Sequence, residues 1–229
     1  MSKPVCAIIG IGPGNGASFA RKFDREGYAI ALLSRSTDFS NELAKELQEA
    51  KAYACDAADP SAVADAFKKV RADLGEVDTL VYNAGSGSWK NVEEISPEEF
   101  ELGWRINTLG ALVASQQVIP AMKKAGAGNI IFIGATASLR GVPMTAGFAP
   151  AKAAQRILAQ SMARHLWPAG IHVAVVIIDG GIRPQNADAP AKPDKLEPDD
   201  IALAVHGLTA QPASAWSFEI DLRPMREKW

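Results

Sequence analysis

Strand-like and helix-like stretches alternate along almost the whole chain of 229 residues, and this alternation constrains the fold more than any single motif does. The apolar runs that favour strands are Val5–Ile9, Ala29–Leu33, Ala52–Cys55, Thr79–Tyr82, Asn129–Ile133, His172–Ile178 and Trp216–Leu222. The amphipathic stretches that favour helices are Ala17–Arg25, Asn41–Glu49, Ser61–Leu74, Pro97–Lys124, Ala146–Leu166 and Pro198–Leu208. This order predicts an α/β fold: a doubly wound parallel sheet of about seven strands, with helices on both faces. Because the sequence contains no linker-like run, we expect a single domain over residues 1–229.

One stretch, residues 183–198, departs from the alternation and carries several prolines, alanines and aspartates. It follows the sixth expected strand, at the edge of the sheet where ligands of such folds bind. Two interpretations stay open: an ordinary surface loop, or a substrate loop that closes over a ligand.

A glycine-rich turn follows the first expected strand and opens the first helix. Glycines at such a turn allow a tight reversal and bring backbone N–H groups close to a pyrophosphate at the helix N-terminus. Glycine-rich turns also occur for structural reasons alone, but the strand–turn–helix context favours a dinucleotide site. The residues that we place at the cofactor are Gly10, Gly12, Gly14, Asn15 and Gly16.

The end of the second expected strand bears on which cofactor binds. An acidic residue at this point would bind the ribose hydroxyls of NAD and would repel a 2′-phosphate. The chain has Ser34-Arg35-Ser36 there instead. Arg35 can pair with a phosphate and the serines can donate hydrogen bonds, so we expect NADP(H) in preference to NAD(H). The alternative is a solvated surface arginine.

Polar motifs follow the next two expected strands, namely Asp56 with Ala57 and then Asn83-Ala84-Gly85. With the glycine turn, Asn107 and Lys152, all in order and at family-like spacing, the chain resembles the short-chain dehydrogenase/reductase family over nearly its whole length. The resemblance implies a Rossmann-type fold and a homodimer or homotetramer. It also implies that Asp56 meets the adenine, that Asn83-Ala84-Gly85 steadies the sheet beside the cofactor, and that Lys152 holds the nicotinamide ribose. Ala57 and Ile182 are expected at the cofactor as well.

The resemblance also implies four catalytic groups: a tyrosine that transfers the proton, a lysine that lowers its pKa, a serine that orients the carbonyl, and an asparagine that anchors a relay water. Carried over, the lysine is Lys152 and the asparagine is Asn107. The tyrosine position falls on Phe148, whose ring cannot donate a proton, and the serine position falls on Ala135. Two of the four groups are therefore expected to be absent.

Other residues can be weighed as replacements. Thr136 or Ser138 can supply a hydroxyl if the turn is shifted, although each also suits a structural turn. Tyr82 is expected to pack in the core. Asp179 is either an acid near the cofactor or a loop-capping carboxylate. Arg183 either clamps an anionic substrate or is an exposed loop residue.

An intact cofactor site beside a proton-poor pocket predicts an NADP(H)-dependent oxidoreductase with a non-standard active site and a small-molecule substrate. Three routes remain open: a proton relayed by water on Lys152 and Asn107, a substrate that carries its own acid, or an iminium or activated-alkene acceptor. The alternative function is a catalytically inactive NADP-binding or regulatory protein.

Bulk properties exclude several other classes. The net charge of −2 argues against nucleic acid or an anionic membrane as the main partner. The run Val5–Ile11 is too short and glycine-rich for a membrane span or a secretory signal, so we expect a cytoplasmic protein. The sequence has no C-x-x-C motif or histidine cluster, so no metal is expected. Cys6 and Cys55 are expected to be buried free thiols.

Overall fold

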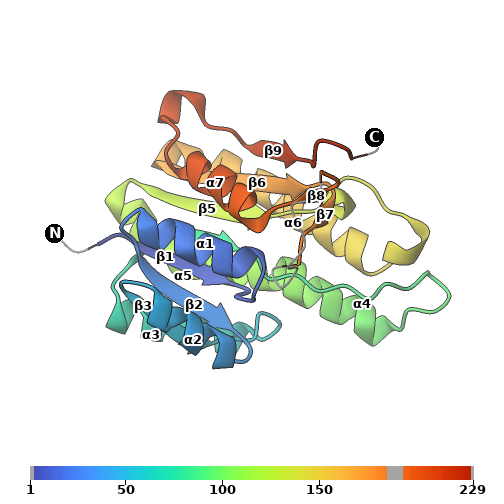
Figure 1. Ribbon diagram of the computed structural model, residues 1–229, viewed down its shortest axis with the longest axis horizontal. Coiled ribbons are helices and arrows are strands. Elements are labelled where there is room, and N and C mark those ends of the chain that lie inside the picture. The colour runs from blue at the N-terminus through green and yellow to red at the C-terminus, as the bar shows by residue number, and fades with distance from the viewer. Residues whose placement is uncertain (1–2, 185–192, 228–229) are drawn as a thin grey trace.

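The computed structural model describes residues 3–184 and 193–227 (Figure 1). Its central sheet has seven parallel strands in the order β3-β2-β1-β4-β5-β6-β9. The strands are β1 (Val5–Ile9), β2 (Ala29–Ser34), β3 (Ala50–Ala54), β4 (Val77–Tyr82), β5 (Gly128–Ile133), β6 (Ile171–Ile178) and β9 (Glu219–Leu222). The predicted seven-stranded, doubly wound sheet is confirmed.

Helices cover both faces of this sheet. They are α1 (Asn15–Arg25), α2 (Asp38–Glu46), α3 (Pro60–Asp73), α4 (Pro97–Trp104), α5 (Gly110–Ala125), α6 (Phe148–Leu166) and α7 (Pro198–Thr209). In Figure 1, α1 and α7 lie together on the near face, and α5 and α6 lie behind the sheet. None of the described helices combines the length and the apolar character needed to cross a lipid bilayer.

Two hydrophobic cores form on opposite faces of the sheet because successive strand side chains point to opposite sides. In β1, Val5, Ala7 and Ile9 belong to the core beneath α3, α5 and α6. Cys6 and Ile8 belong to the core beneath α1 and α7. Strands buried on both faces in this way have the continuous apolar sequences from which the parallel sheet was predicted.

Several element boundaries differ from the prediction. The second helix ends at Glu46 rather than Glu49 because Leu47 already has an extended backbone, and the third strand accordingly begins at Ala50. The last strand is shorter than expected: Trp216 precedes it and stacks on His172, with the ring centroids 4.8 Å apart. Part of the irregular stretch 183–198 forms a short strand, β8 (Lys195–Leu196), which pairs in parallel with β7 (Gly181–Ile182). Residues 185–192 of the expected substrate loop lie outside the described residues.

The helical stretch predicted at Pro97–Lys124 is confirmed over Pro97–Ala125, but it contains a π-helical turn, Arg105–Leu109, between α4 and α5. Two carbonyl groups of this turn accept hydrogen bonds from side chains. The Tyr82 hydroxyl donates to the Ile106 carbonyl, and the Gln155 amide donates to the Asn107 carbonyl at 2.7 Å. These bonds connect the turn to β4 and to α6. Tyr82 lies in the core, as the sequence predicted.

Substituting Tyr82 tests the contribution of the first of these bonds. We expect Tyr82→Phe to lower the free energy of unfolding by about 1–3 kcal/mol, because the buried Ile106 carbonyl loses its donor while the ring stays in place. Urea denaturation followed by circular dichroism measures the change, and an unaltered m-value would confirm that the two-state transition is preserved. A loss within about 0.5 kcal/mol would mean that the hydroxyl contributes no more than a surface group.

Candidate cofactor and active site

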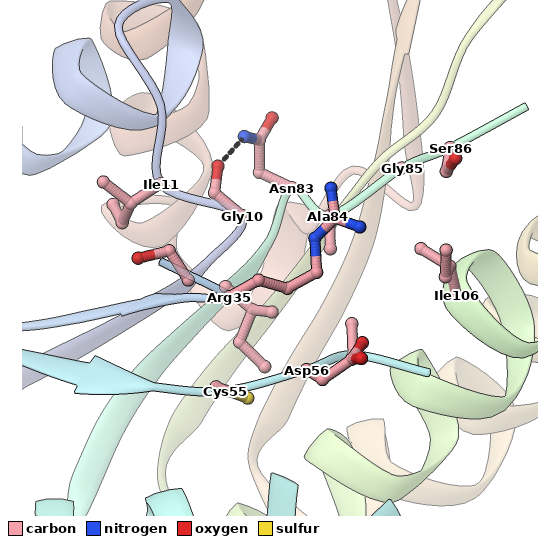
Figure 2. Close-up of a pocket in the computed structure, with 13 residues that line it drawn as sticks. Gly10, Ile11, Arg35, Cys55, Asp56, Asn83, Ala84, Gly85, Ser86 and Ile106 are labelled. Carbon is pink, nitrogen blue, oxygen red and sulfur yellow. Dashed lines mark hydrogen bonds between the residues drawn. The ribbon is translucent and has the colours of Figure 1, made fainter. Parts of the chain in front are cut away.

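Two pockets lie side by side at the carboxyl edge of the sheet, and they share the lining residues Asn83, Gly85 and Ser86. The first, with a volume of about 320 Å³, is bounded by the ends of β1, β2, β3 and β4 (Figure 2). The second, of about 360 Å³, lies between the glycine-rich turn, the end of β5 and the start of α6. Because they share these lining residues, the two pockets adjoin each other, and together they are called the groove below.

The turn after β1 is held against the loop that follows β4. Gly10 has a φ of +94°, and a β-carbon on it would lie 2.5 Å from the backbone nitrogen of Ala84. The Asn83 side chain donates to the Gly10 carbonyl at 2.7 Å, as Figure 2 shows. Only glycine combines this conformation with so close an approach. Asn83 and Ala84 thus shape the wall between the two pockets.

The remaining turn glycines divide into two groups. A β-carbon on Gly16 would lie 2.8 Å from the Gly10 carbonyl oxygen, so the fold itself requires glycine there. Gly12 and Gly14 would meet nothing within 4 Å. Helix α1 begins after Gly14 without a side-chain cap. The Ala17 and Ser18 amides donate to the carbonyls of Gly12 and Gly14, which leaves the amides of Asn15 and Gly16 for an anion. The Asn15 side-chain oxygen is buried without a hydrogen-bond partner, and Asn15 is among the residues that line the second pocket.

The residues after β2 and β3 line the first pocket. The exposed Arg35 side chain extends across this pocket in Figure 2. The hydroxyls of Ser34 and Ser36 bond locally: Ser34 donates to the Ser36 carbonyl at 2.8 Å, and Ser36 to Asp38 at 3.1 Å. Asp56 accepts from the Ala58 amide at 2.9 Å and remains exposed at the rim.

A buried thiol also lines this pocket. Burial, followed by the nearby Asp56, raises the pKa of Cys55 to about 12, so the thiol stays protonated near neutral pH. Cys6 and Cys55 are both buried and unpaired, and the expectation of free thiols is confirmed. Ala57 and Ile106 complete the apolar part of the lining.

The second pocket brings Phe148, Ala135 and Lys152 together, as the sequence predicted, and Ile182 also lines it. The Phe148 ring packs against the backbone at Gly87, where a β-carbon would lie 2.6 Å from Phe148 Cβ. Trp89 lies beside it, with the ring centroids 5.6 Å apart. The Lys152 ammonium is 6.0 Å from the Phe148 ring centroid. One wall of the pocket is therefore aromatic.

Lys152 is held in place by two hydrogen bonds. Its ammonium donates to the Ile133 carbonyl at 2.8 Å and to the Gln155 side-chain oxygen at 3.2 Å. Burial lowers its pKa to about 8, because a low-dielectric environment disfavours the charged form. Lys152 can therefore gain or lose a proton near neutral pH.

Asn107 lies in the π-turn and is fully buried, outside the lining of either pocket. Its amide nitrogen donates to the carbonyls of Ser86 and Gly103, at 2.6 and 2.7 Å. Its side-chain oxygen has no hydrogen-bond partner and lies 3.4 Å from the position of a β-carbon on Gly85. The backbone carbonyl of Asn107 is occupied by Gln155.

Thr136 and Ser138, whose hydroxyls were weighed as replacements, do not line the second pocket. Thr136 donates its hydroxyl to Asp179, and Ser138 accepts from the Ala135 amide at 3.1 Å. Asp179 is buried and forms ion pairs with Arg223, at 2.6 Å, and with Arg140, at 3.3 Å. Asp179 thus joins the loop after β5 to the end of β9, which favours the structural interpretation over that of an acid at the cofactor.

Other candidates lie outside the two pockets. Arg183 forms an ion pair with Glu197 at 3.2 Å. The histidines at positions 165, 172 and 206 line neither pocket. Over residues 3–184 and 193–227, no His, Cys, Asp or Glu side chains gather in a group that could hold a metal ion.

Sequence reasoning missed two contributors, Trp89 and Gln155. Trp89 stands in the otherwise small and polar run Gly85-Ser86-Gly87-Ser88, which would have marked it as a ligand contact. Gln155 lies three residues after Lys152, a spacing that places both side chains on one face of a helix. A polar side chain at that spacing was the available signal.

Comparison with known proteins agrees with this geometry. The model of the short chain dehydrogenase family matches residues 4–191. The chain belongs to the short-chain dehydrogenase family. The solved structure of a short-chain dehydrogenase from Rhodopseudomonas palustris is 32% identical, with a TM-score of 0.85, and the match covers 96% of this chain and 98% of that one.

Two further relatives of the chain support the assignment to this family. An alcohol dehydrogenase from the archaeon Thermococcus sibiricus, complexed with 5-hydroxy-NADP, is 29% identical, with a TM-score of 0.89 and 99% of each chain covered. An uncharacterized oxidoreductase of Staphylococcus epidermidis is 26% identical over 233 residues, covering 98% of this chain and 99% of that protein. The chain is thus an oxidoreductase of the short-chain dehydrogenase type.

Two glycines of the turn after β1 allow cofactor binding and folding stability to be tested separately. We expect Gly12→Ala to leave the unfolding midpoint unchanged and to weaken NADPH binding about tenfold or more, because the new methyl group points into open space that only a ligand would occupy. Gly16→Ala should destabilise the fold by about 1–3 kcal/mol through contact with Gly10 and Ile11. Thermal denaturation and fluorescence titration measure the two effects; equal NADPH affinity in Gly12→Ala and the wild type would contradict the assignment.

Proposed function

We propose that the protein is an NADP(H)-dependent oxidoreductase that reduces a small, unsaturated substrate without a side-chain hydroxyl acid. The observation that carries this proposal is the lining of the second pocket. There, Phe148 and Ala135 stand where the family resemblance implies a tyrosine and a serine, while Lys152 remains beside them. The residues that the family resemblance places at the cofactor are thus present, whereas the tyrosine and serine that it implies for proton transfer are not.

The residues of the groove fit a nicotinamide dinucleotide. Gly12 and Gly14 leave open space at the uncapped start of α1, where a pyrophosphate would accept from backbone amides. Asn15 and Lys152 line the second pocket, where their side chains would meet the nicotinamide ribose and amide. When bound, the reduced cofactor supplies a hydride to the substrate.

Arg35 is the residue that we propose selects NADP(H). Its guanidinium is available at the first pocket, and the relative from Thermococcus sibiricus was crystallised with an NADP derivative. A guanidinium pairs with a phosphate dianion through strong, charge-assisted hydrogen bonds. The nearby serine hydroxyls already have local acceptors, so the preference rests on Arg35.

Arg35→Ala tests this selectivity. We expect the variant to bind NADPH about ten- to a hundredfold more weakly, with NADH affinity nearly unchanged, because only NADPH carries the 2′-phosphate. Fluorescence titrations with both nucleotides measure the ratio. The exposed Arg25, at the end of α1, gives the control Arg25→Ala, which should retain the wild-type ratio. A parallel loss of NADPH and NADH affinity in Arg35→Ala would contradict the proposal.

The lining of the second pocket also limits the substrate. An absent general acid costs roughly 10²–10⁴-fold in rate, or about 3–5 kcal/mol of barrier, for a ketone that must become an alcohol. An activated alkene avoids this cost, since hydride addition gives a delocalised enolate that can take its proton later. The Lys152 ammonium favours an acceptor that gains negative charge over a cationic iminium. We therefore propose an activated alkene, packed against Phe148 and Trp89.

Restoring the missing groups tests this chemistry. We expect Phe148→Tyr, combined with Ala135→Ser, to raise NADPH-dependent reduction of at least one ketone in a carbonyl panel by about 10²-fold or more. The wild type should reduce activated alkenes and be nearly inactive on the same ketones. Absorbance at the NADPH band follows both reactions. Wild-type ketone reduction as fast as that of the double variant would contradict the proposal, and an absence of NADPH consumption with any acceptor would favour the non-catalytic alternative.

A further inference from the structure

The Gln155 side chain forms a bridge behind the second pocket. It is 1% exposed and lies on α6, on the same face as Lys152. Its oxygen accepts from the Lys152 ammonium at 3.2 Å, and its nitrogen donates to the Asn107 backbone carbonyl at 2.7 Å. One amide therefore spans the space between the lysine and the π-turn.

The chemistry of the two partners fixes the orientation of this amide. Lys152 presents only donors, and the Asn107 carbonyl is only an acceptor. Turning the amide over would place its NH₂ against the ammonium and its oxygen against the carbonyl, and both hydrogen bonds would be lost. Buried polar groups without partners are costly. The Gln155 dipole is thus held with its negative end toward Lys152.

The bridge also determines where the third ammonium proton can go. An ammonium has three donors. Two of them are taken by the Ile133 carbonyl and by Gln155. Lys152 lines the second pocket, so its third donor can reach a ligand bound there.

We propose that Gln155 is a positioning residue: its amide holds the Lys152 ammonium toward the second pocket and fills the gap to the Asn107 carbonyl that would otherwise admit a water molecule. An amide does not pass protons along as a water molecule does. Proton exchange at Lys152 is therefore directed to the pocket side. This inference deepens the proposed function and rests on the same site.

The surroundings of Lys152 make this role measurable. Across the described chain, the side chains that face its ammonium are neutral: Asn107 from the π-turn, and Gln155 and Phe148 from α6. The end of β5 and the loop after β4 face it with backbone, at Ile133 and Gly85. Burial lowers its pKa to about 8. An acceptor bonded to an ammonium favours the charged form. Removing this acceptor should lower the pKa further.

The experiment is an NMR titration of the Lys152 side chain, labelled with carbon-13 at Cε, in the protein without cofactor. We expect Gln155→Met, which keeps the length of the side chain but has no amide, to lower the Lys152 pKa and shift its protonation equilibrium about tenfold toward the neutral form. Gln155→Glu, which adds a negative charge at the acceptor, should shift it in the opposite direction. Gln160→Met, on the same helix, is the matched control and should leave the Lys152 titration unchanged.

An unchanged Lys152 pKa in Gln155→Met overturns the inference, since a residue that only packs would alter stability without altering this titration. If Gln155→Met does not fold, Gln155→Glu alone decides. A Lys152 titration midpoint equal to that of the wild type then overturns the inference. The proposed function is tested separately by NADPH titration of the wild type. If the wild type does not bind NADPH but the Gln155 variants show the expected shifts in the Lys152 pKa, the cofactor assignment is rejected and the role of Gln155 stands.

Discussion

The π-helical turn Arg105–Leu109 has two carbonyl groups that accept from side chains of other elements, and the geometry of the site depends on these bonds. Tyr82 reaches one of them from β4, and Gln155 reaches the other from α6. A buried carbonyl without a donor costs free energy, so the bonds fix the spacing between the sheet edge and α6. That spacing in turn determines where Lys152 lies, because Gln155 is also one of its two hydrogen-bond acceptors.

The two parts of the groove differ in the side chains that line them. The glycine turn and Arg35 line the pocket where we propose that the phosphorylated dinucleotide binds, whereas Phe148 and Trp89 form an aromatic wall. The ammonium of Lys152 lies in the same pocket, whose polar lining also includes Asn15, Asn83 and Ser86. We infer that binding and orientation of the cofactor have been kept while the usual proton transfer has been replaced, which favours substrates whose reduction separates the hydride from the proton.

Much of this could be predicted from the sequence because its causes are local. Continuous apolar runs specify buried parallel strands, and Gly10 marks a turn that only glycine can form. The meeting of Phe148, Ala135 and Lys152 in one pocket also followed from the order of motifs. The π-helical turn before Gly110 could not be predicted, because it is stabilised by distant partners such as Tyr82. The engagement of the Thr136 hydroxyl was likewise hidden, since Asp179 lies far along the chain.

The crystal structure of the complex with NADP⁺ tests the central claim most directly. The account predicts the nicotinamide ring in the second pocket, in contact with Phe148 and Ala135, with Lys152 bonded to the ribose and no side-chain hydroxyl within hydrogen-bond reach of the space above the reactive carbon. A nicotinamide ring bound outside this pocket would contradict the account. So would a Thr136 or Ser138 hydroxyl turned toward the ring, since the site would then contain the proton donor that we infer it lacks.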